Sequence, residues 1–326
     1  MSAPWLIVCA SFLFATMGVC VKLAAAEYPT GEIVFYRSLT GAILMLALAR
    51  WQRGTVATRV PAMHFWRSVS GVVSLVLWFY ALGGLPLATA MTLNYMSSVW
   101  MALFLIGGAV ALSAPTLPSV AAPRGGAAGL GAARRPAVGT ARVDGRLVAT
   151  VLVGFAGVAL ILRPTIEEQQ LWHGLMGLLS GVIAATAYLQ VTALGRAGEP
   201  EYRIVFYFSV GGIAAGALTL LWTGGFHAHS WRGAGLLLAV GVLATAAQLM
   251  MTRAYSTGRT LVNASLQYLG IVWSFGYGIF IFGDRVTALA LSGMLLIVAA
   301  GVSATLLRSR SSATSLSAIA DPPNTV

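Results

Sequence analysis

Apolar runs of about 20 residues recur along almost the whole chain, and no other feature constrains its fold as strongly. A helix needs roughly 20 apolar residues to cross a hydrocarbon core about 30 Å thick. Of the 326 residues, 58% are hydrophobic and 9% are charged, whereas a typical soluble domain carries roughly 25% charged residues. The runs are too continuous for the short alternating strands of a membrane β-barrel. The sequence therefore predicts an all-α polytopic membrane protein.

The apolar runs predict ten transmembrane helices. The expected spans are residues 5–25, 33–49, 66–85, 87–111, 146–163, 171–194, 203–222, 231–252, 260–282 and 286–307. The first run also resembles a signal peptide, because Ala24-Ala25-Ala26 imitates a cleavage site. No Lys or Arg precedes that run, and its removal would destroy the repeat described below, so we interpret it as the first helix.

The basic residues predict the orientation of these helices. With the amino terminus inside, 15 of the 20 Lys and Arg residues fall on the cytoplasmic side. The charged residues expected on the outer side are Lys22, Arg37, Arg163, Arg232, Arg285, Glu27, Glu32, Glu167, Glu168 and Asp284. We therefore expect a multi-pass protein of a bacterial inner membrane with both termini in the cytoplasm. The net charge of +11 follows this positive-inside pattern and does not indicate binding to nucleic acid.

The two halves of the chain are related in sequence. Residues 92–100 (TLNYMSSVW) match residues 265–273 (SLQYLGIVW) at an offset of 173, and residues 33–36 match residues 204–207 (both IVFY) at an offset of 171. Each copy contains five predicted helices. An odd number of crossings forces the second copy to enter the membrane from the opposite side, which predicts inverted repeats, an arrangement common among secondary transporters.

The repeat also divides the chain into regions. The first repeat comprises residues 1–111 and 141–165, and the second comprises residues 166–307. Between the two parts of the first repeat, residues 112–140 are rich in Pro, Gly, Ala and Arg, which predicts a disordered cytoplasmic insert. A disordered cytoplasmic tail is expected over residues 308–326.

Several kinds of chemistry are missing from the sequence. The four His residues fall in predicted loops or at helix ends, and the single lysine, Lys22, is not part of a phosphate-binding loop. No acidic residue lies at mid-depth in any predicted helix, where an intramembrane enzyme or a proton relay would need one. We expect no cofactor, no metal site and no enzymatic activity.

Polar residues in two equivalent helices suggest a substrate pathway. Four positions in residues 260–282 share one helical face: Asn263, Gln267, Gly270 and Ser274. The matching face of residues 87–111 includes Asn94 and Ser97, with Ser98 adjacent. We predict that Asn94 and Gln267 converge near the repeat axis. The alternative is that these amides only form hydrogen bonds between helices.

Further polar residues complete the candidates. Thr186 and Gln190 share one helical face, as do Gln248 and Tyr255. Lys22, Glu32 and Arg37 lie near the predicted outer side; they either pair with one another and snorkel, or serve anion recognition or gating. The matching tyrosines Tyr95 and Tyr268 point away from the amide face and are predicted to be packing residues. Gly177/Gly181 and Gly212/Gly216 are predicted to permit close helix packing.

The five-plus-five organisation resembles the EamA-type drug/metabolite transporter superfamily. The residues that carry this resemblance are FYRSL around Arg37, GFAGVALILRP at residues 154–164 and FGDRV at residues 282–286. A proline that is usual in the fourth and ninth helices of that family is absent here. The resemblance implies alternating-access transport of a small metabolite such as an amino acid, vitamin or nucleoside-like molecule. A helical receptor or assembly subunit is the alternative; a homodimer, the direction of transport and metabolite export all stay open.

Overall fold

The protein is helical throughout the part that its structure, a computed structural model, describes. That part comprises residues 3–101, 103–104, 168–222, 224–257, 266–284, 287–289 and 291–300, with isolated positions at 149, 153, 156, 157, 160, 263, 302 and 303. Its helices are α1 (Ala3–Ala24), α2 (Thr30–Trp51), α3 (Pro61–Gly84), α4 (Leu87–Tyr95), α7 (Glu168–Arg196), α8 (Glu201–Trp222), α9 (Trp231–Thr257) and α11 (Leu269–Phe282). No strand occurs among these residues, as expected for a helical membrane protein.

Six of the helices are long and apolar enough to cross a membrane: α1, α2, α3, α7, α8 and α9. Two shorter apolar helices, α11 and Leu291–Ala300, lie within the predicted ninth and tenth spans. Most of the predicted fifth span, the insert at 112–140 and the tail at 308–326 lie outside the described residues. The described part is thus a polytopic helical membrane protein.

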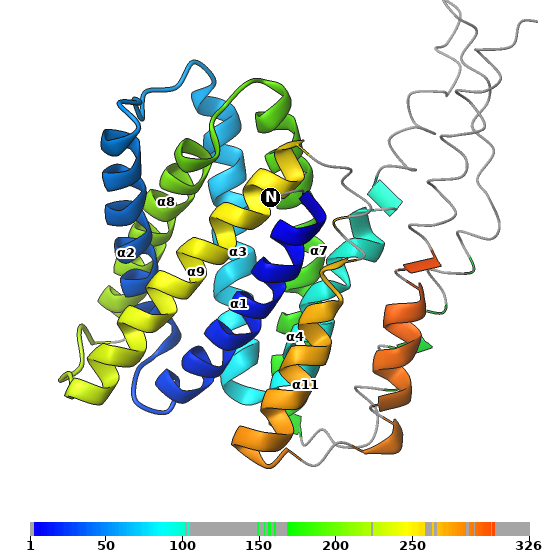
Figure 1. Ribbon diagram of the computed structural model, residues 1–326. Coiled ribbons are helices and arrows are strands. Elements are labelled where there is room, and N and C mark those ends of the chain that lie inside the picture. The colour runs from blue at the N-terminus through cyan, green and yellow to red at the C-terminus, as the bar shows by residue number, and fades with distance from the viewer. Residues whose placement is uncertain are drawn as a thin grey trace, which may run out of the picture.

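Helices from the two halves of the sequence pack against one another rather than forming two separate bundles (Figure 1). The main contacts join α1 to α9, α3 to α7 and α2 to α8, while α4 packs against α11. Each of these pairs joins one helix from the first half with one from the second. A space at the centre of the bundle is therefore lined by both halves.

Small residues let α2 and α8 approach closely. A side chain at Gly216 would place its Cβ 2.7 Å from the Cα of Phe35, which is closer than real Cβ contacts. The nearest heavy atom to a Cβ at Gly41 would be Ser209 Oγ, and the nearest to a Cβ at Gly212 would be Ser38 Oγ. This geometry confirms the prediction that Gly212 and Gly216 are needed for packing.

Two helices are interrupted where the sequence predicts continuous spans. α4 ends at Tyr95, and helical structure resumes after a turn at Met96; α11 begins after a turn at Gln267 and Tyr268. At these turns Val99 N donates to Met96 O at 2.9 Å, and Gly270 N donates to Gln267 O at 2.9 Å. Both are the short-range bonds of a 3₁₀ turn. The expected spans over 87–111 and 260–282 did not indicate these turns, because such a turn needs no proline and leaves the apolar composition unchanged.

Candidate functional site

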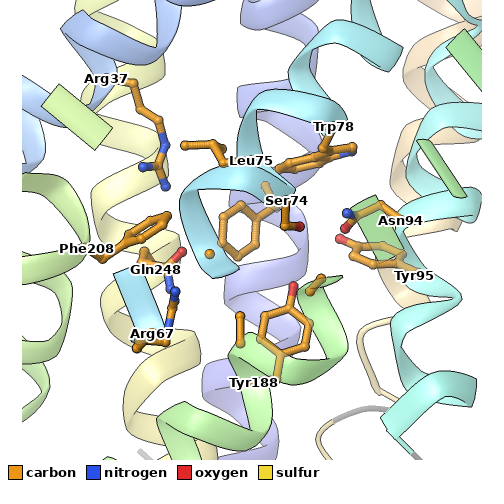
Figure 2. A pocket seen from close by; sticks show the side chains of 14 residues that line it. Arg37, Arg67, Ser74, Leu75, Trp78, Asn94, Tyr95, Tyr188, Phe208 and Gln248 are labelled. Carbon is orange, nitrogen blue, oxygen red and sulfur yellow. The ribbon is translucent and has the colours of Figure 1, made fainter. Parts of the chain in front are cut away.

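A buried cavity of about 50 Å³ lies at the centre of the bundle and receives side chains from both halves (Figure 2). Its lining residues are Phe14, Arg37, Arg67, Gly71, Ser74, Leu75, Trp78, Asn94, Tyr95, Ala184, Ala187, Tyr188, Phe208 and Gln248. They come from α1, α2, α3, α4, α7, α8 and α9. Burying charged and amide groups inside an apolar bundle is energetically costly, and such groups usually mark a functional site. This cavity is therefore the candidate site.

Two arginines are the most unusual residues of the cavity. Arg37 of α2 is 4% exposed and Arg67 of α3 is 2% exposed. Their guanidinium carbons lie 4.9 Å and 4.6 Å from the ring centroid of Phe208, which lies between them in Figure 2. Hydrogen-bond partners are missing for Nε of Arg37 and for Nε and Nη1 of Arg67 among the described residues. The cavity therefore holds two cations that share one aromatic ring.

The acidic side chains that the structure describes are all engaged elsewhere, at the helix ends. Glu27 accepts a hydrogen bond from Ser230 Oγ, and Glu201 lies 3.9 Å from Arg253. The ion pairs of Glu32, Glu199 and Asp284 likewise involve residues other than the two cavity arginines. Within the described chain, neither cavity arginine has a carboxylate partner.

Arg37 does not form the pair with Glu32 that the sequence suggested. Glu32 instead lies 2.9 Å from His227 Nδ1 and 3.0 Å from His229 Nε2. Because Glu32 lies in the first turn of α2, its side chain meets the loop before α9, whereas Arg37 lies deeper and faces the cavity. The alternative in which Arg37 pairs with Glu32 was wrong.

Arg67 was missed as a candidate because the third helix begins earlier than predicted. The sequence placed the start at residue 66 and hence Arg67 at the cytoplasmic edge. In the structure α3 begins at Pro61, so Arg67 lies about two turns inside the helix. Proline is favoured in the first turn of a helix, and Pro61 was the signal that could have located this start.

The two equivalent amides occupy different surroundings. Asn94 lines the cavity, and its Nδ2 donates to Ser180 Oγ at 2.9 Å. Gln267 is not among the lining residues; its Oε1 accepts from the Tyr255 hydroxyl at 3.1 Å and its Nε2 lies 3.4 Å from Met251 Sδ. Gln248 does line the cavity, with no partner for its buried Nε2 among the described residues. Asn94 and Gln248 are thus the amides that face the central space.

The other predicted pathway residues lie around the cavity without lining it. Buried positions are held by Ser97, Ser98, Asn263 and Ser274. Asn263 Nδ2 donates to Ala254 O and Ser274 Oγ donates to Gly270 O. Thr186 Oγ1 donates to Ile183 O, and Gln190 Oε1 accepts from Ser70 Oγ. Tyr255 stacks on the cavity residue Tyr188, with ring centroids 5.3 Å apart.

Tyr95, predicted to be a packing residue, also lines the cavity. It packs against Gly270, where an added Cβ would lie 2.5 Å from the Tyr95 hydroxyl oxygen. Asn94 and Tyr95 are neighbours in α4, so their side chains point in directions about 100° apart. Both line the cavity, which therefore contacts a wider part of α4 than the amide face alone.

Comparison with known proteins identifies the family. Residues 1–107 match the model of the EamA-like transporter family. The chain is also 34% identical over 301 residues to the pseudopaline exporter CntI of Pseudomonas aeruginosa strain UCBPP-PA14, covering 92% of this chain and 94% of that protein. This chain belongs to the EamA-like transporter family. It is therefore a small-molecule transporter of the drug/metabolite transporter superfamily and works in a lipid bilayer.

Two more distant matches also extend over almost the whole chain. An uncharacterized transporter of Helicobacter pylori strain J99 is 23% identical over 306 residues, covering 91% of this chain and 92% of that one. One protein of known crystal structure aligns with a TM-score of 0.61 at 17% identity, covering 94% of this chain and 98% of the other. The match to that structure is a likeness of fold alone.

Polar contacts join the helices of this EamA-type transporter at both ends of the bundle. At the end that carries the α1–α2 loop, Lys22 Nζ lies 3.7 Å from Asp284 Oδ1 and donates to Leu85 O at 3.2 Å. At the opposite end, Glu199 accepts hydrogen bonds from Thr58 Oγ1 and Arg203 Nη1, and its Oε2 lies 3.1 Å from His64 Nε2. The central cavity lies between these two sets of contacts.

Replacing Glu199 by Gln is expected to destabilise the protein by about 1.5 to 3 kcal/mol, because Glu199 accepts charge-assisted hydrogen bonds at a buried helix junction. Burial raises the pKa of Glu199, but the bonds from Arg203, His64 and Thr58 outweigh it and lower the pKa below the ordinary value of 4.5. The carboxylate therefore contributes its stability above pH 4.5, and that contribution is lost as the pH falls through the lowered pKa. Thermal unfolding between pH 3 and 7 checks this. An unchanged acid transition in E199Q would contradict it.

Proposed function

We propose that this protein is a secondary transporter that exports a small organic metabolite across a bacterial inner membrane by alternating access. The observation that carries the proposal is the central cavity, which contains two buried arginines and two amides and is lined by helices from both halves of the chain. Secondary transporters place substrates near the bilayer midplane between their repeats. Export is supported by the 34% identity to the Pseudomonas aeruginosa protein named a pseudopaline exporter.

We propose further that ten helices form two inverted five-helix repeats, with the boundaries derived from the sequence. Three features support this. The contacts of Gly41 with Ser209 and of Gly212 with Ser38 are related by the same sequence offset of 171. The pair α1 with α9 corresponds to the pair α7 with α3, and α1 and α7 run in opposite directions in Figure 1. Helical structure is interrupted at nearly corresponding positions, after α4 at Met96 and before α11 at Gln267 and Tyr268.

The contacts at the two ends of the bundle are the proposed gates. In this conformation the cavity of about 50 Å³ has room for a few water molecules, but not for an amino acid, vitamin or nucleoside-like molecule. Substrate entry therefore requires the helices to separate at one end. We assign the outer gate to Lys22 with Asp284 and Glu32 with His227, and the inner gate to Glu199 and its partners.

Metabolite analysis of growth medium tests the proposed function. Cells that overproduce the protein should release at least one metabolite that deletion cells retain. Inside-out vesicles containing the protein should then accumulate that metabolite. A protein that is correctly inserted but changes no metabolite in either assay would instead be a receptor or assembly subunit, and the transport proposal would be overturned.

The orientation of the helices gives a separate prediction. Because Lys and Arg concentrate on one side of the predicted membrane, both termini and the insert should be cytoplasmic. Fusions of a cytoplasm-active reporter after Arg134 and after Arg308 should be active, and a fusion within the loop around His227 should be inactive. Activity at His227 would reverse the orientation, and different sides for Arg134 and Arg308 would contradict an even number of crossings between them.

A further inference from the structure

We propose that the transported metabolite is an organic dianion whose two separate carboxylates bind Arg37 and Arg67. This inference rests on the proposed transport function and adds the chemical class of the substrate. Both arginines line the central cavity and are almost fully buried. Arginine remains protonated in proteins, so each contributes a full positive charge to the cavity.

The cavity has an excess of positive charge that the described protein does not neutralise. A charge removed from water is strongly unfavourable unless a counter-charge and hydrogen bonds compensate it. The five acidic side chains that the structure describes are paired at the helix ends. The remaining four acids in the sequence, Asp144, Glu167, Glu168 and Asp321, lie outside the apolar runs. The compensating anion is therefore expected to be the ligand.

The placement of the arginines indicates two carboxylates rather than one anionic group. Phe208 lies between the two guanidinium groups (Figure 2), and each is within 5 Å of its ring centroid. A single phosphate beside one guanidinium would be separated from the other guanidinium by the Phe208 ring. A molecule that extends past the edge of the ring and carries a carboxylate at each end can reach both guanidinium groups. The two parallel N–H donors of a guanidinium match the two oxygens of a carboxylate.

The unpartnered hydrogen-bond donors agree with this arrangement. Among the described residues, no partner is present for Arg37 Nε, Arg67 Nε, Arg67 Nη1 and Gln248 Nε2. Every one of these groups is a donor, so together they suit a ligand rich in acceptor oxygens. Trp78 and Tyr188 supply aromatic surface between Asn94 and the arginines, and Tyr95 lies beside Asn94. The ligand is thus expected to carry an apolar body as well as its two carboxylates.

The first test identifies carboxyl groups on whatever the protein exports. Medium from cells that overproduce the intact protein is compared with medium from cells that carry a double variant, R37Q with R67Q, and each sample is analysed before and after methyl esterification. A metabolite that depends on the intact protein should gain two methyl groups or more. A dependent metabolite that gains one or none, or equal release of the metabolite by the double variant, overturns the inference while leaving transport in place. If the intact protein releases no metabolite beyond what deletion cells release, the proposed function is overturned.

The second test measures binding to the purified full chain and does not depend on transport. The probes are N-benzoylglutamate with two carboxylates, N-benzoylglutamine with one, N-benzoylglutaminamide with none, and phenyl phosphate. The dicarboxylate should protect against thermal unfolding at a concentration roughly 10- to 100-fold lower than the monocarboxylate requires. R37Q and R67Q should each remove this difference between the dicarboxylate and the monocarboxylate, whereas R37K and R67K should keep part of it. R232Q, at an exposed arginine, should keep all of it.

Two outcomes of the binding series would overturn the inference. One is equal protection by the dicarboxylate and the monocarboxylate, which would mean that the two arginines do not act together. The other is stronger protection by phenyl phosphate than by any carboxylate, which would assign the cavity to a phosphate ester. Both comparisons are made on the unmodified protein, so they remain decisive even where an arginine variant fails to fold.

Discussion

Protein in which methionine replaces Arg67 should resist thermal unfolding better than the parent and should not transport. Arg67 is 2% exposed and has no acidic partner in the described chain. Replacing buried ionic groups by apolar side chains of similar volume stabilises proteins by about 1 to 4 kcal/mol in several cases. The same replacement removes a proposed substrate contact, so stability and activity are expected to change in opposite directions.

Thermal unfolding of the detergent-purified protein, measured together with export from cells, checks this prediction. R67K keeps the charge and should show no gain in stability. R232M, at an exposed arginine, should leave both stability and export unchanged. If R67M were less stable than the parent, Arg67 would be a structural residue with a partner outside the described chain, and its assignment to the substrate would fail.

Replacing Asn94 by leucine should abolish transport while leaving membrane insertion intact. Asn94 lines the cavity, and its partner Ser180 keeps a second hydrogen bond to Gly177 O after the substitution. A buried substrate group that loses its hydrogen-bond partner costs about 1 to 3 kcal/mol, or roughly 5- to 150-fold in affinity. Export from cells, normalised to the amount of inserted protein, measures the effect.

The sequence predicts the same role for Gln267 and Asn94, but in the structure only Asn94 lines the cavity. Gln267 binds Tyr255 and Met251 outside the cavity, so Q267L should lower thermal stability more than N94L does. Gln190, which binds Ser70 away from the cavity, offers a matched amide control, and Q190L should transport normally. Normal transport by N94L, with reduced thermal stability, would show that Asn94 only joins helices.

Local composition was sufficient to determine the type of fold and the family of this protein. The length of the apolar runs predicts membrane-spanning helices because the bilayer thickness is fixed. The placement of Arg, the matches between the halves and the motif around Arg37 indicated an EamA-type transporter, and the comparisons confirm that family. Asn94, Gln248 and Arg37 could also be selected from sequence, because a polar residue inside an apolar run is costly wherever it lies.

Tertiary structure decided which of these polar residues share one site. Arg37 and Arg67 meet at Phe208, which is more than 140 positions further along the chain, and nothing in a hydropathy pattern specifies that contact. Gln267 and Asn94 have equivalent sequence positions but different partners, since Asn94 binds Ser180 of α7 and Gln267 binds Tyr255 of α9. Hydropathy reports how deeply a residue lies in the bilayer, whereas the rotation and packing of each helix determine what that residue contacts.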